Sequence, residues 1–225
     1  MKTRSLILLP FILFSVVVSA QNSRAYIKEQ IGIQGQCKNV AITQTNGDLM
    51  LYGKNGWAGS GLPSELANAL HDLHNEHETI VDVQLTEYGA WLILYGNNGF
   101  CWDGIPYSLE QTIREWNREN EKITSVTFND SGDWIVISER YIKASSQNIQ
   151  NWLVELGNKY GLIYATCITN DAIVVCLEGG YGYRGNIPQS LKDALKTEKR
   201  GIYRIKIAGT SWFYADRNGS YRYYM

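Results

Sequence analysis

Short hydrophobic strands, glycine-containing turns and amphipathic helices succeed one another along this chain in a fixed order. The clearest example is the stretch from Gly89 to Leu109, GAWLILYGNNGFCWDGIPYSL. It predicts a strand at Trp91–Tyr95 and a second strand at Phe100–Trp102, joined by a tight turn at Asn98-Gly99, because Asn-Gly favours the positive φ angles of a type I′ hairpin. Pro106 then predicts the start of a helix, since proline suits the first helical position.

The same order of elements recurs five times with a period of about 42 residues, which is in the range of repeat architectures. Each unit begins with a strand of alternating apolar residues, so we expect one buried face. A turn, a second strand and a second turn lead to a third strand that begins with an aromatic residue. The alternating residues are Val40 and Ile42; Val81, Val83 and Leu85; Val126 and Phe128; Ile163, Ala165 and Cys167; and Ile205 and Ile207. The leading aromatic residues are Trp57, Phe100, Tyr141, Tyr181 and Tyr221.

The first four units each end in a predicted amphipathic helix. The expected helix starts are Pro63, Pro106, Ser146 and Pro188. Apolar residues then recur at i, i+4 and i+7, which places them on one stripe: Leu66, Leu70 and Leu73; Leu109, Ile113 and Trp116; and Ile149, Leu153 and Leu156. The fourth helix has Glu198 at the third place of the stripe, so we expect it to be shorter or more exposed. One unit cannot bury its apolar face alone, and neighbouring units must therefore stack.

The two ends of the chain determine the predicted topology. The fifth unit ends at Met225 without a helix, and residues 23–36 precede the first unit. Within them, Tyr26–Ile31 predicts a short helix with Ile27 and Ile31 on one face. If residues 23–36 take the place of a fifth helix, the units close into a ring, which resembles a β-propeller at the level of architecture. The predicted fold class is therefore a β-rich α+β repeat protein of five β-β-β-α units closed into a propeller-like toroid. The alternative is an open solenoid of the same units.

The N-terminal segment has the pattern of a cleaved signal peptide. Lys2 and Arg4 are followed by an apolar run to Val18 and by a small-residue cleavage site at Ser19-Ala20. The apolar run is shorter than the ~20 residues that span a membrane. We therefore expect a secreted or periplasmic protein without a membrane span. The expected organisation is a signal peptide at 1–20 and a single repeat domain at 21–225, with units at approximately 37–78, 79–121, 122–160, 161–200 and 201–225, and with 23–36 closing the ring.

Charge and cysteine content exclude some functions. The chain has 21 basic and 22 acidic residues without a basic block, so it lacks the electrostatic footprint of a nucleic-acid partner. Four cysteines allow three full disulfide pairings that the sequence does not separate: Cys37, Cys101, Cys167 and Cys176. Without C-x-x-C spacing, a zinc ribbon or thioredoxin-type site is disfavoured. We expect small buried residues, with a diagonal Cys167–Cys176 bridge as the strained alternative.

Histidines and carboxylates are the candidate residues for metal binding and catalysis. All three histidines lie in one predicted helix, where His71 and His74 form a weak candidate pair for a metal ion. The H-E-x-x-H motif of zinc proteases is absent. The conspicuous carboxylates fall at turns and helix starts, where acids cap structure: Asp103, Glu110, Asp130 and Asp133. Because no acid stands out as a departure from the repeat in an apolar setting, we expect no catalytic residue, no metal and no cofactor.

Aromatic residues on the third strands are the candidate ligand-binding groups. They recur next to Asn-Gly turns, and a ring beside polar groups can stack on a sugar or hold an extended peptide. The predicted site residues are Trp57, Trp102, Tyr183, Tyr223 and Asn98. The competing interpretation is that these rings pack beneath the helix of their own unit, because aromatic residues bury a large area. We assign Trp91, Trp134 and Trp212 to the core.

The sequence thus favours a secreted, non-catalytic binding module for an extracellular glycan or protein. One alternative is a glycoside hydrolase that acts on polysaccharide, and another is a purely structural or interaction domain. A binding module with repeated sites should place equivalent residues on one rim. An enzyme should instead have a single cleft in which one or two acids break the repeat.

Overall fold

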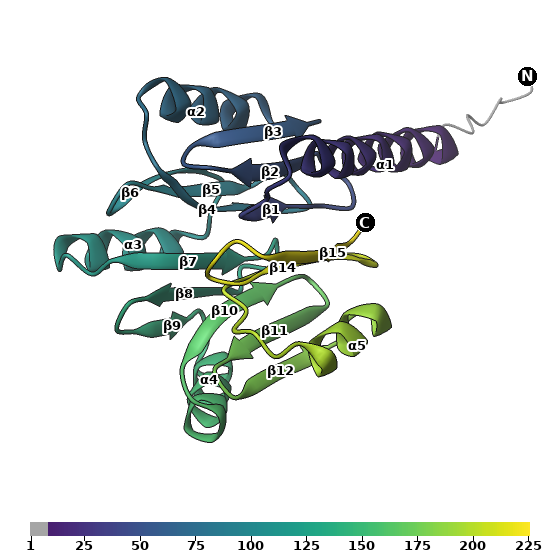
Figure 1. The fold of residues 1–225 in the computed structure, drawn as a ribbon. Coiled ribbons are helices and arrows are strands. Elements are labelled where there is room, and N and C mark those ends of the chain that lie inside the picture. Colours follow the sequence, from purple (N-terminus) through teal and green to yellow (C-terminus); the bar gives the residue numbers. More distant parts are fainter. Residues whose placement is uncertain (1–8) are drawn as a thin grey trace, which may run out of the picture.

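The computed structural model describes residues 9–225, with side chains described from Asn22 onward (Figure 1). Residues 1–8 of the predicted signal peptide lie outside the described residues. The backbone from Leu9 belongs to helix α1 (Leu9–Gln34), which also contains the short helix expected at Tyr26–Ile31. In the part of the chain that is described, no helix is long and apolar enough to cross a membrane.

Residues 9–225 form five three-stranded antiparallel sheets and five helices in repeated units, which confirms the predicted β-rich repeat. The first three sheets are β1 (Asn39–Ala41), β2 (Asp48–Tyr52) and β3 (Gly56–Ser60); β4 (Ile80–Leu85), β5 (Trp91–Tyr95) and β6 (Gly99–Asp103); and β7 (Ile123–Phe128), β8 (Trp134–Ser138) and β9 (Ile142–Ala144). The last two are β10 (Ile163–Ile168), β11 (Ala172–Leu177) and β12 (Gly180–Gly185); and β13 (Arg204–Ala208), β14 (Ser211–Ala215) and β15 (Tyr221–Tyr224). Every sheet pairs strands that are consecutive in the chain, so each unit forms by local hairpins.

The four later helices begin one residue after the predicted starts. They are α2 (Ser64–Asn75), α3 (Tyr107–Arg118), α4 (Gln147–Tyr160) and α5 (Gln189–Thr197). Pro63, Pro106 and Pro188 are N-caps with extended ψ angles, so the expectation of proline at the first helical position is wrong by one residue. The proline carbonyl accepts the first helical N–H bond, which places the residue just outside the helix. As expected, α5 is the shortest of the four, with 9 residues.

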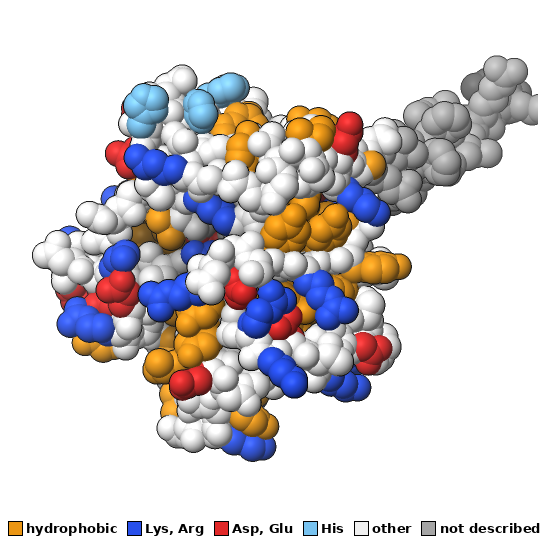
Figure 2. Space-filling view, viewed as in Figure 1, with side chains coloured by type: hydrophobic (Ala, Val, Ile, Leu, Met, Phe, Trp, Pro, Cys, Tyr) orange, Lys and Arg blue, Asp and Glu red, His pale blue; other side chains and the backbone are white. Residues whose placement is uncertain are grey.

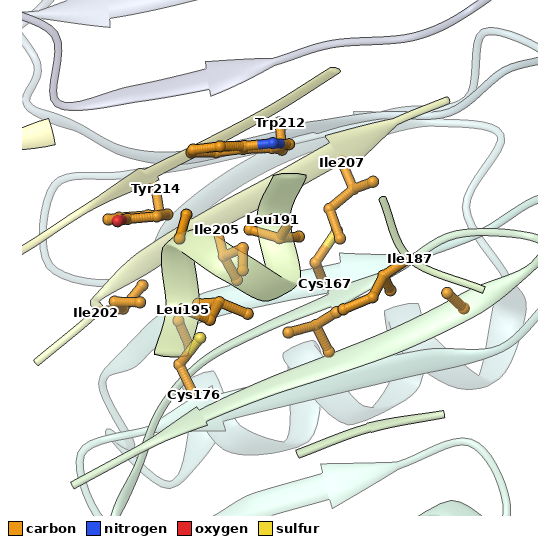
Figure 3. Close-up of a cluster of buried hydrophobic side chains, with 14 residues drawn as sticks. Cys167, Cys176, Ile187, Leu191, Leu195, Ile202, Ile205, Ile207, Trp212 and Tyr214 are labelled. Carbon is orange, nitrogen blue, oxygen red and sulfur yellow. The ribbon is translucent and has the colours of Figure 1, made fainter. Parts of the chain in front are cut away.

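The hydrophobic core is divided into five clusters, and each lies between two consecutive sheets and one helix. In one of them, Leu70 of α2 packs with Leu51 of β2 and Ile93 of β5. Figure 3 shows a second one, in which Leu195 of α5 lies between Cys176 on one sheet and the next sheet. The apolar stripe of each helix is thus wide enough to contact two sheets, in agreement with the expectation that neighbouring units stack.

The fifth cluster brings the two ends of the chain together. Ile27 and Ile31 of α1 are buried with Phe213 and Ala215 of β14, and Tyr221 of β15 packs against them. α1 also contacts β2 and β3. Residues 23–34 thus lie between the fifth and the first sheet, in the position that a helix of the fifth unit would take.

A buried ion pair holds α1 to the first sheet. Arg24 Nε lies 2.8 Å from Asp48 Oδ2, and the Asp48 side chain is fully buried. Arg24 Nη2 donates to the Thr43 carbonyl at 2.6 Å. The Asp48 carboxylate also accepts from Ser23 Oγ and from the Thr43 N–H. These bonds satisfy the buried carboxylate, and they fix the rotation of α1 about its axis.

The first strands of the sheets contact one another in the order β1, β4, β7, β10 and β13, and β13 also contacts β1. They are buried on both faces, and the expectation of one buried face is wrong for them. In β4 the register shifts between Ile80 and Asp82. Such an irregularity changes which side chains share a face. Val81 is consequently half-buried, whereas Asp82 and Gln84 are buried.

The packing of α1 predicts unequal roles for two nearby isoleucines. Ile31 is 2% exposed and Ile33 is 64% exposed. We expect Ile31→Ala to lower the free energy of unfolding by about 2–4 kcal/mol, because it leaves a cavity between two sheets. The matched Ile33→Ala variant should change it by less than about 0.5 kcal/mol. Urea denaturation followed by tryptophan fluorescence measures both, and equal losses would contradict the described role of α1.

Candidate functional site: a central cavity lined by all five units

A cavity of about 470 Å³ lies at the ends of the five first strands. Residues from every unit line it, and they come mainly from the C-terminal ends of β1, β4, β7, β10 and β13 and from the loops that follow. Representative lining residues are Ala41, Gln84, Phe128, Ile168 and Ala208. The segment that leads into α5 adds Asn186, Ile187, Pro188 and Gln189. The repeat therefore produces one shared cavity.

Lys206 of β13 is the only lysine or arginine that lines this cavity within the described residues. Its side chain is buried, and Nζ donates to the Val83 carbonyl at 2.9 Å and to Gln84 Oε1 at 3.0 Å. The same ammonium lies 3.4 Å from Asp82 Oδ1. The fifth unit thus reaches across to β4 of the second unit, and the positive charge is neutralised beneath the cavity.

Asp82 is 1% exposed and accepts hydrogen bonds from three neighbouring strands and from its own. Asn39 Nδ2 donates to Oδ1 at 2.6 Å, and Ser125 Oγ donates to Oδ2 at 2.9 Å. The N–H groups of Val83 and Val126 also donate to the carboxylate. Burial by itself would raise the pKa of Asp82, but the charges of Lys206 and Arg204 and these hydrogen bonds lower it overall. Asp82 is therefore ionised and paired.

This ion pair corrects the sequence analysis, which found no acid that departs from the repeat in an apolar setting. Asp82 stands where the first and third units have Asn39 and Ser125. Both charges fall at polar positions of the apolar alternation, Asp82 between Val81 and Val83 and Lys206 between Ile205 and Ile207, so the local pattern predicts a solvent-facing residue at each. Only the spatial arrangement of the strands shows that the two charges meet.

Carboxylates at the cavity mouth connect the loops of successive units. Glu87 Oε2 accepts from the N–H of Gln44 at 2.7 Å and of Thr45 at 3.0 Å. Asp130 in turn accepts from the N–H of Glu87 at 3.2 Å. These two acids therefore have a structural task, and each unit orders the loop of the unit before it. This agrees with the sequence interpretation of Asp130 as a turn residue.

The mouth is polar and the wall beneath it is apolar. Gln44, Asn170 and Thr210 are exposed at the mouth, and Ile187 and Ile207 are buried in the wall. Glu87, Asp130 and Asp171 are the acids of the mouth. With Lys206 already paired, the net charge that a ligand would encounter is negative. The cavity can thus hold a neutral group that combines hydroxyls with apolar C–H surface.

The predicted aromatic site residues lie on outer strands, and none of them lines the central cavity. Trp57 of β3 packs against the cluster of α2, with its ring 5.1 Å from that of His71. Trp102 of β6 stacks on Phe100 with centroids 4.7 Å apart, and the Arg114 guanidinium lies 4.9 Å from its centroid. Such contacts are expected if these rings pack against the helix of their own unit, which was the competing interpretation of the sequence.

The other predicted site residues are distributed over separate units. Tyr183 of β12 is 41% exposed, and Lys192 Nζ lies 5.2 Å from its ring. Tyr223 of β15 packs against the fifth cluster. The Asn98 carbonyl accepts from Asn117 Nδ2 at 2.8 Å. The structure does not bring these groups together into one site. The core assignments are confirmed for Trp91, Trp134 and Trp212.

The histidines and Cys37, Cys101 and Cys176 do not line the central cavity, whereas the buried Cys167 does. The histidines are exposed (Figure 2), but only His71 and His74 lie on α2. His77 follows the end of the helix with a φ angle of 57°, so the expectation that all three share one helix is wrong. His74 Nδ1 faces the Asn55 carbonyl. In the described part of the chain, no group of three or more His, Cys, Asp or Glu residues could hold a metal ion. All four cysteines are free thiols. Burial raises the pKa of Cys101 and of Cys167 to about 11, so both are neutral thiols at ordinary pH.

The pairing of Lys206 with Asp82 predicts strong coupling between their substitutions. Lys206→Met should lower the free energy of unfolding by about 3–5 kcal/mol, because it leaves a buried carboxylate without its counter-charge. Adding Asp82→Asn should restore part of this loss, since no net buried charge remains. Chemical denaturation of the two single variants, the double variant and the wild type measures the coupling. If the loss of unfolding free energy in the double variant equals the sum of the losses in the two single variants, the described pair is wrong.

The lowered pKa of Asp82 predicts an acid dependence of stability. A carboxyl whose pKa is lower in the folded state stabilises the protein above the unfolded value of about 3.9, and this stabilisation is lost as the pH falls through the folded pKa. Between about pH 4 and pH 2, wild-type stability should therefore fall more steeply than that of the Asp82→Asn/Lys206→Met variant. Thermal unfolding across this range measures the difference, and parallel curves would show that Asp82 titrates normally.

A scan against protein-family models gives no match for this chain, and a search of curated proteins finds no relative. The functional interpretation therefore depends on the geometry of the central cavity.

Proposed function

We propose that the five sheets close into a propeller-like toroid, and that its central cavity binds a neutral extracellular glycan without catalysing a reaction. Two features support closure. The first strand of the fifth sheet contacts β1, and α1 packs between the fifth and the first sheet. An open solenoid of the same units would leave those two sheets apart.

The observation that carries the proposed binding function is the single cavity to which all five units contribute. Its volume of about 470 Å³ falls within the range of about 300–1,000 Å³ that is usual for small-ligand sites. In a ring of similar units, the axis is the one place where every repeat can contact the same ligand. A sugar placed there can receive hydrogen bonds from several loops at once.

The chemistry of the cavity supports a sugar over an anionic ligand. A sugar presents hydroxyl groups and apolar C–H faces, and the cavity offers amide and hydroxyl side chains at the mouth above an apolar wall. The acids at the mouth disfavour a negatively charged ligand, because like charges repel. Lys206 does not offset them, since its ammonium is bound to Asp82, Val83 and Gln84.

The engagement of the acids supports binding without catalysis. A glycoside hydrolase uses a pair of carboxyl groups on either side of the scissile bond. Here, Glu87 and Asp130 accept backbone N–H bonds that order the neighbouring loops. Asp82 is buried in its ion pair. We therefore favour the binding module over the hydrolase.

The proposal includes export and removal of the signal peptide. Cleavage after Ala20 would keep the part of α1 that packs against the sheets, since Arg24, Ile27 and Ile31 lie beyond the cleavage site. The mature protein would thus retain the element between its fifth and first sheets. The binding site would then face the periplasm or the exterior of the cell.

Blocking the mouth tests the proposed function. Thr210 lines the cavity and is exposed, so Thr210→Trp places an indole at the mouth without disturbing the core. We expect binding to an array of neutral gluco-, galacto-, manno- and N-acetylglucosamine oligosaccharides to fall at least tenfold. Asn218→Trp, in the exposed turn before β15, is the matched control and should bind like the wild type.

Two further variants separate the cavity from the outer aromatic residues. Trp102→Ala and Tyr183→Ala should leave array binding unchanged, because neither residue lines the cavity. Loss of binding in these variants, with normal binding by Thr210→Trp, would place the site on the outer strands instead. If the wild type binds no glycan on the array, the proposed function is wrong.

A further inference from the structure

A second depression, of about 530 Å³, adjoins the central cavity. It lies between the β4–β5 loop, the segment that leads into α3 and the β7–β8 loop. Asn129 and Asp130 line both spaces. The two spaces therefore adjoin at the start of the β7–β8 loop, and the second one lies between loops of the second and third units.

Tyr88 is the most unusual residue that lines this depression. Its side chain is 84% exposed, the highest value among the large hydrophobic residues of the described chain. The corresponding turn positions carry Asn46, Ser131 and Asn170 in other units, so the aromatic ring breaks the repeat. Packing gives no reason for a ring at this position, because so little of it is buried.

The backbone that carries Tyr88 is well ordered by its neighbours. Its N–H faces Asp130 Oδ1 at 3.4 Å, and the Gly89 N–H donates to the Thr86 carbonyl at 3.2 Å. Gly89 has a φ angle of 92°, which favours glycine and closes the turn. The ring is therefore presented from a fixed loop, so that binding to it would cost little backbone entropy.

Other residues that line the depression supply complementary groups. Ile105 and Pro106 are half-buried and offer apolar surface, and Asp103 is exposed. An aromatic ring with an apolar wall can hold the C–H face of a sugar, while carboxylates accept hydrogen bonds from its hydroxyls. Asp103 and Asp130 also make this space unfavourable for anionic sugars, as the mouth of the central cavity is.

We propose that this depression is a second sugar subsite, with Tyr88 as its stacking platform, and that the natural ligand is a neutral oligosaccharide rather than a monosaccharide. One end of the glycan occupies the central cavity, and the following residues run past Asn129 and Asp130 to Tyr88. This inference rests on the proposed glycan binding by the cavity, and it names the class of glycan.

The test compares oligosaccharides of different length. The arrayed neutral sugars are titrated by calorimetry as chains of one to six residues against the wild type, Tyr88→Ser and Tyr224→Ser. Tyr88→Ser introduces the residue that the third unit has at this position. Tyr224 is 56% exposed on β15 and lines neither space, so it is the matched control.

For the wild type and Tyr224→Ser, we expect affinity to rise about tenfold as the chain grows beyond one or two residues. Tyr88→Ser should bind the monosaccharide normally but gain less than about twofold with length. If length dependence is equal in all three proteins, the subsite is wrong while the cavity proposal stands. Weaker monosaccharide binding by Tyr88→Ser also overturns it, because Tyr88 would then belong to the cavity. If no sugar binds to the wild type, both proposals fail.

Discussion

Each helix of this protein has an apolar stripe that two sheets must cover, and this requirement governs the rest of the structure. Leu66, Leu70 and Leu73 of α2 are buried only because the first and second sheets enclose them together. A three-stranded sheet with one helix would expose much of that area, at a cost of about 25 cal/mol for each Å² of apolar surface. The units are therefore not independent domains. Each interface is completed by the next unit.

The same requirement explains the role of α1. In the described residues no helix follows the fifth sheet, yet Phe213 and Tyr214 on its two faces are fully buried. Ile27 and Ile31 cover the face that carries Phe213. The ion pair of Arg24 with Asp48 then sets the orientation of the helix. A segment from the start of the chain thus supplies the packing that a fifth helix would give.

The first strands of the sheets show how similar units come to differ. Asp82 and Lys206 occur once each, and they come from the second and fifth units. A buried ion pair is weak evidence for stability, because desolvation of both charges opposes their attraction. The pair links the first strands of the second and fifth sheets, since Lys206 also donates to the Val83 carbonyl and to Gln84 Oε1. The cavity above it is lined by different residues from each unit.

Much of this molecule could be determined from the order of residues alone. The fivefold repeat, its strands and turns and its helices follow from hydrophobic periodicity and from proline and glycine positions, because these signals act within a few residues. The burial of Trp91, Trp134 and Trp212 was also predictable, because each is a large residue near the start of the second strand of its unit. The tertiary structure decided what depends on distant strands meeting: the burial of both faces of β4, the pairing of Asp82 with Lys206 across 124 positions, and the cavity shared by all units. The residues next to a charged side chain or a polar loop do not indicate which distant residue it will contact, because the packing of whole sheets determines that contact.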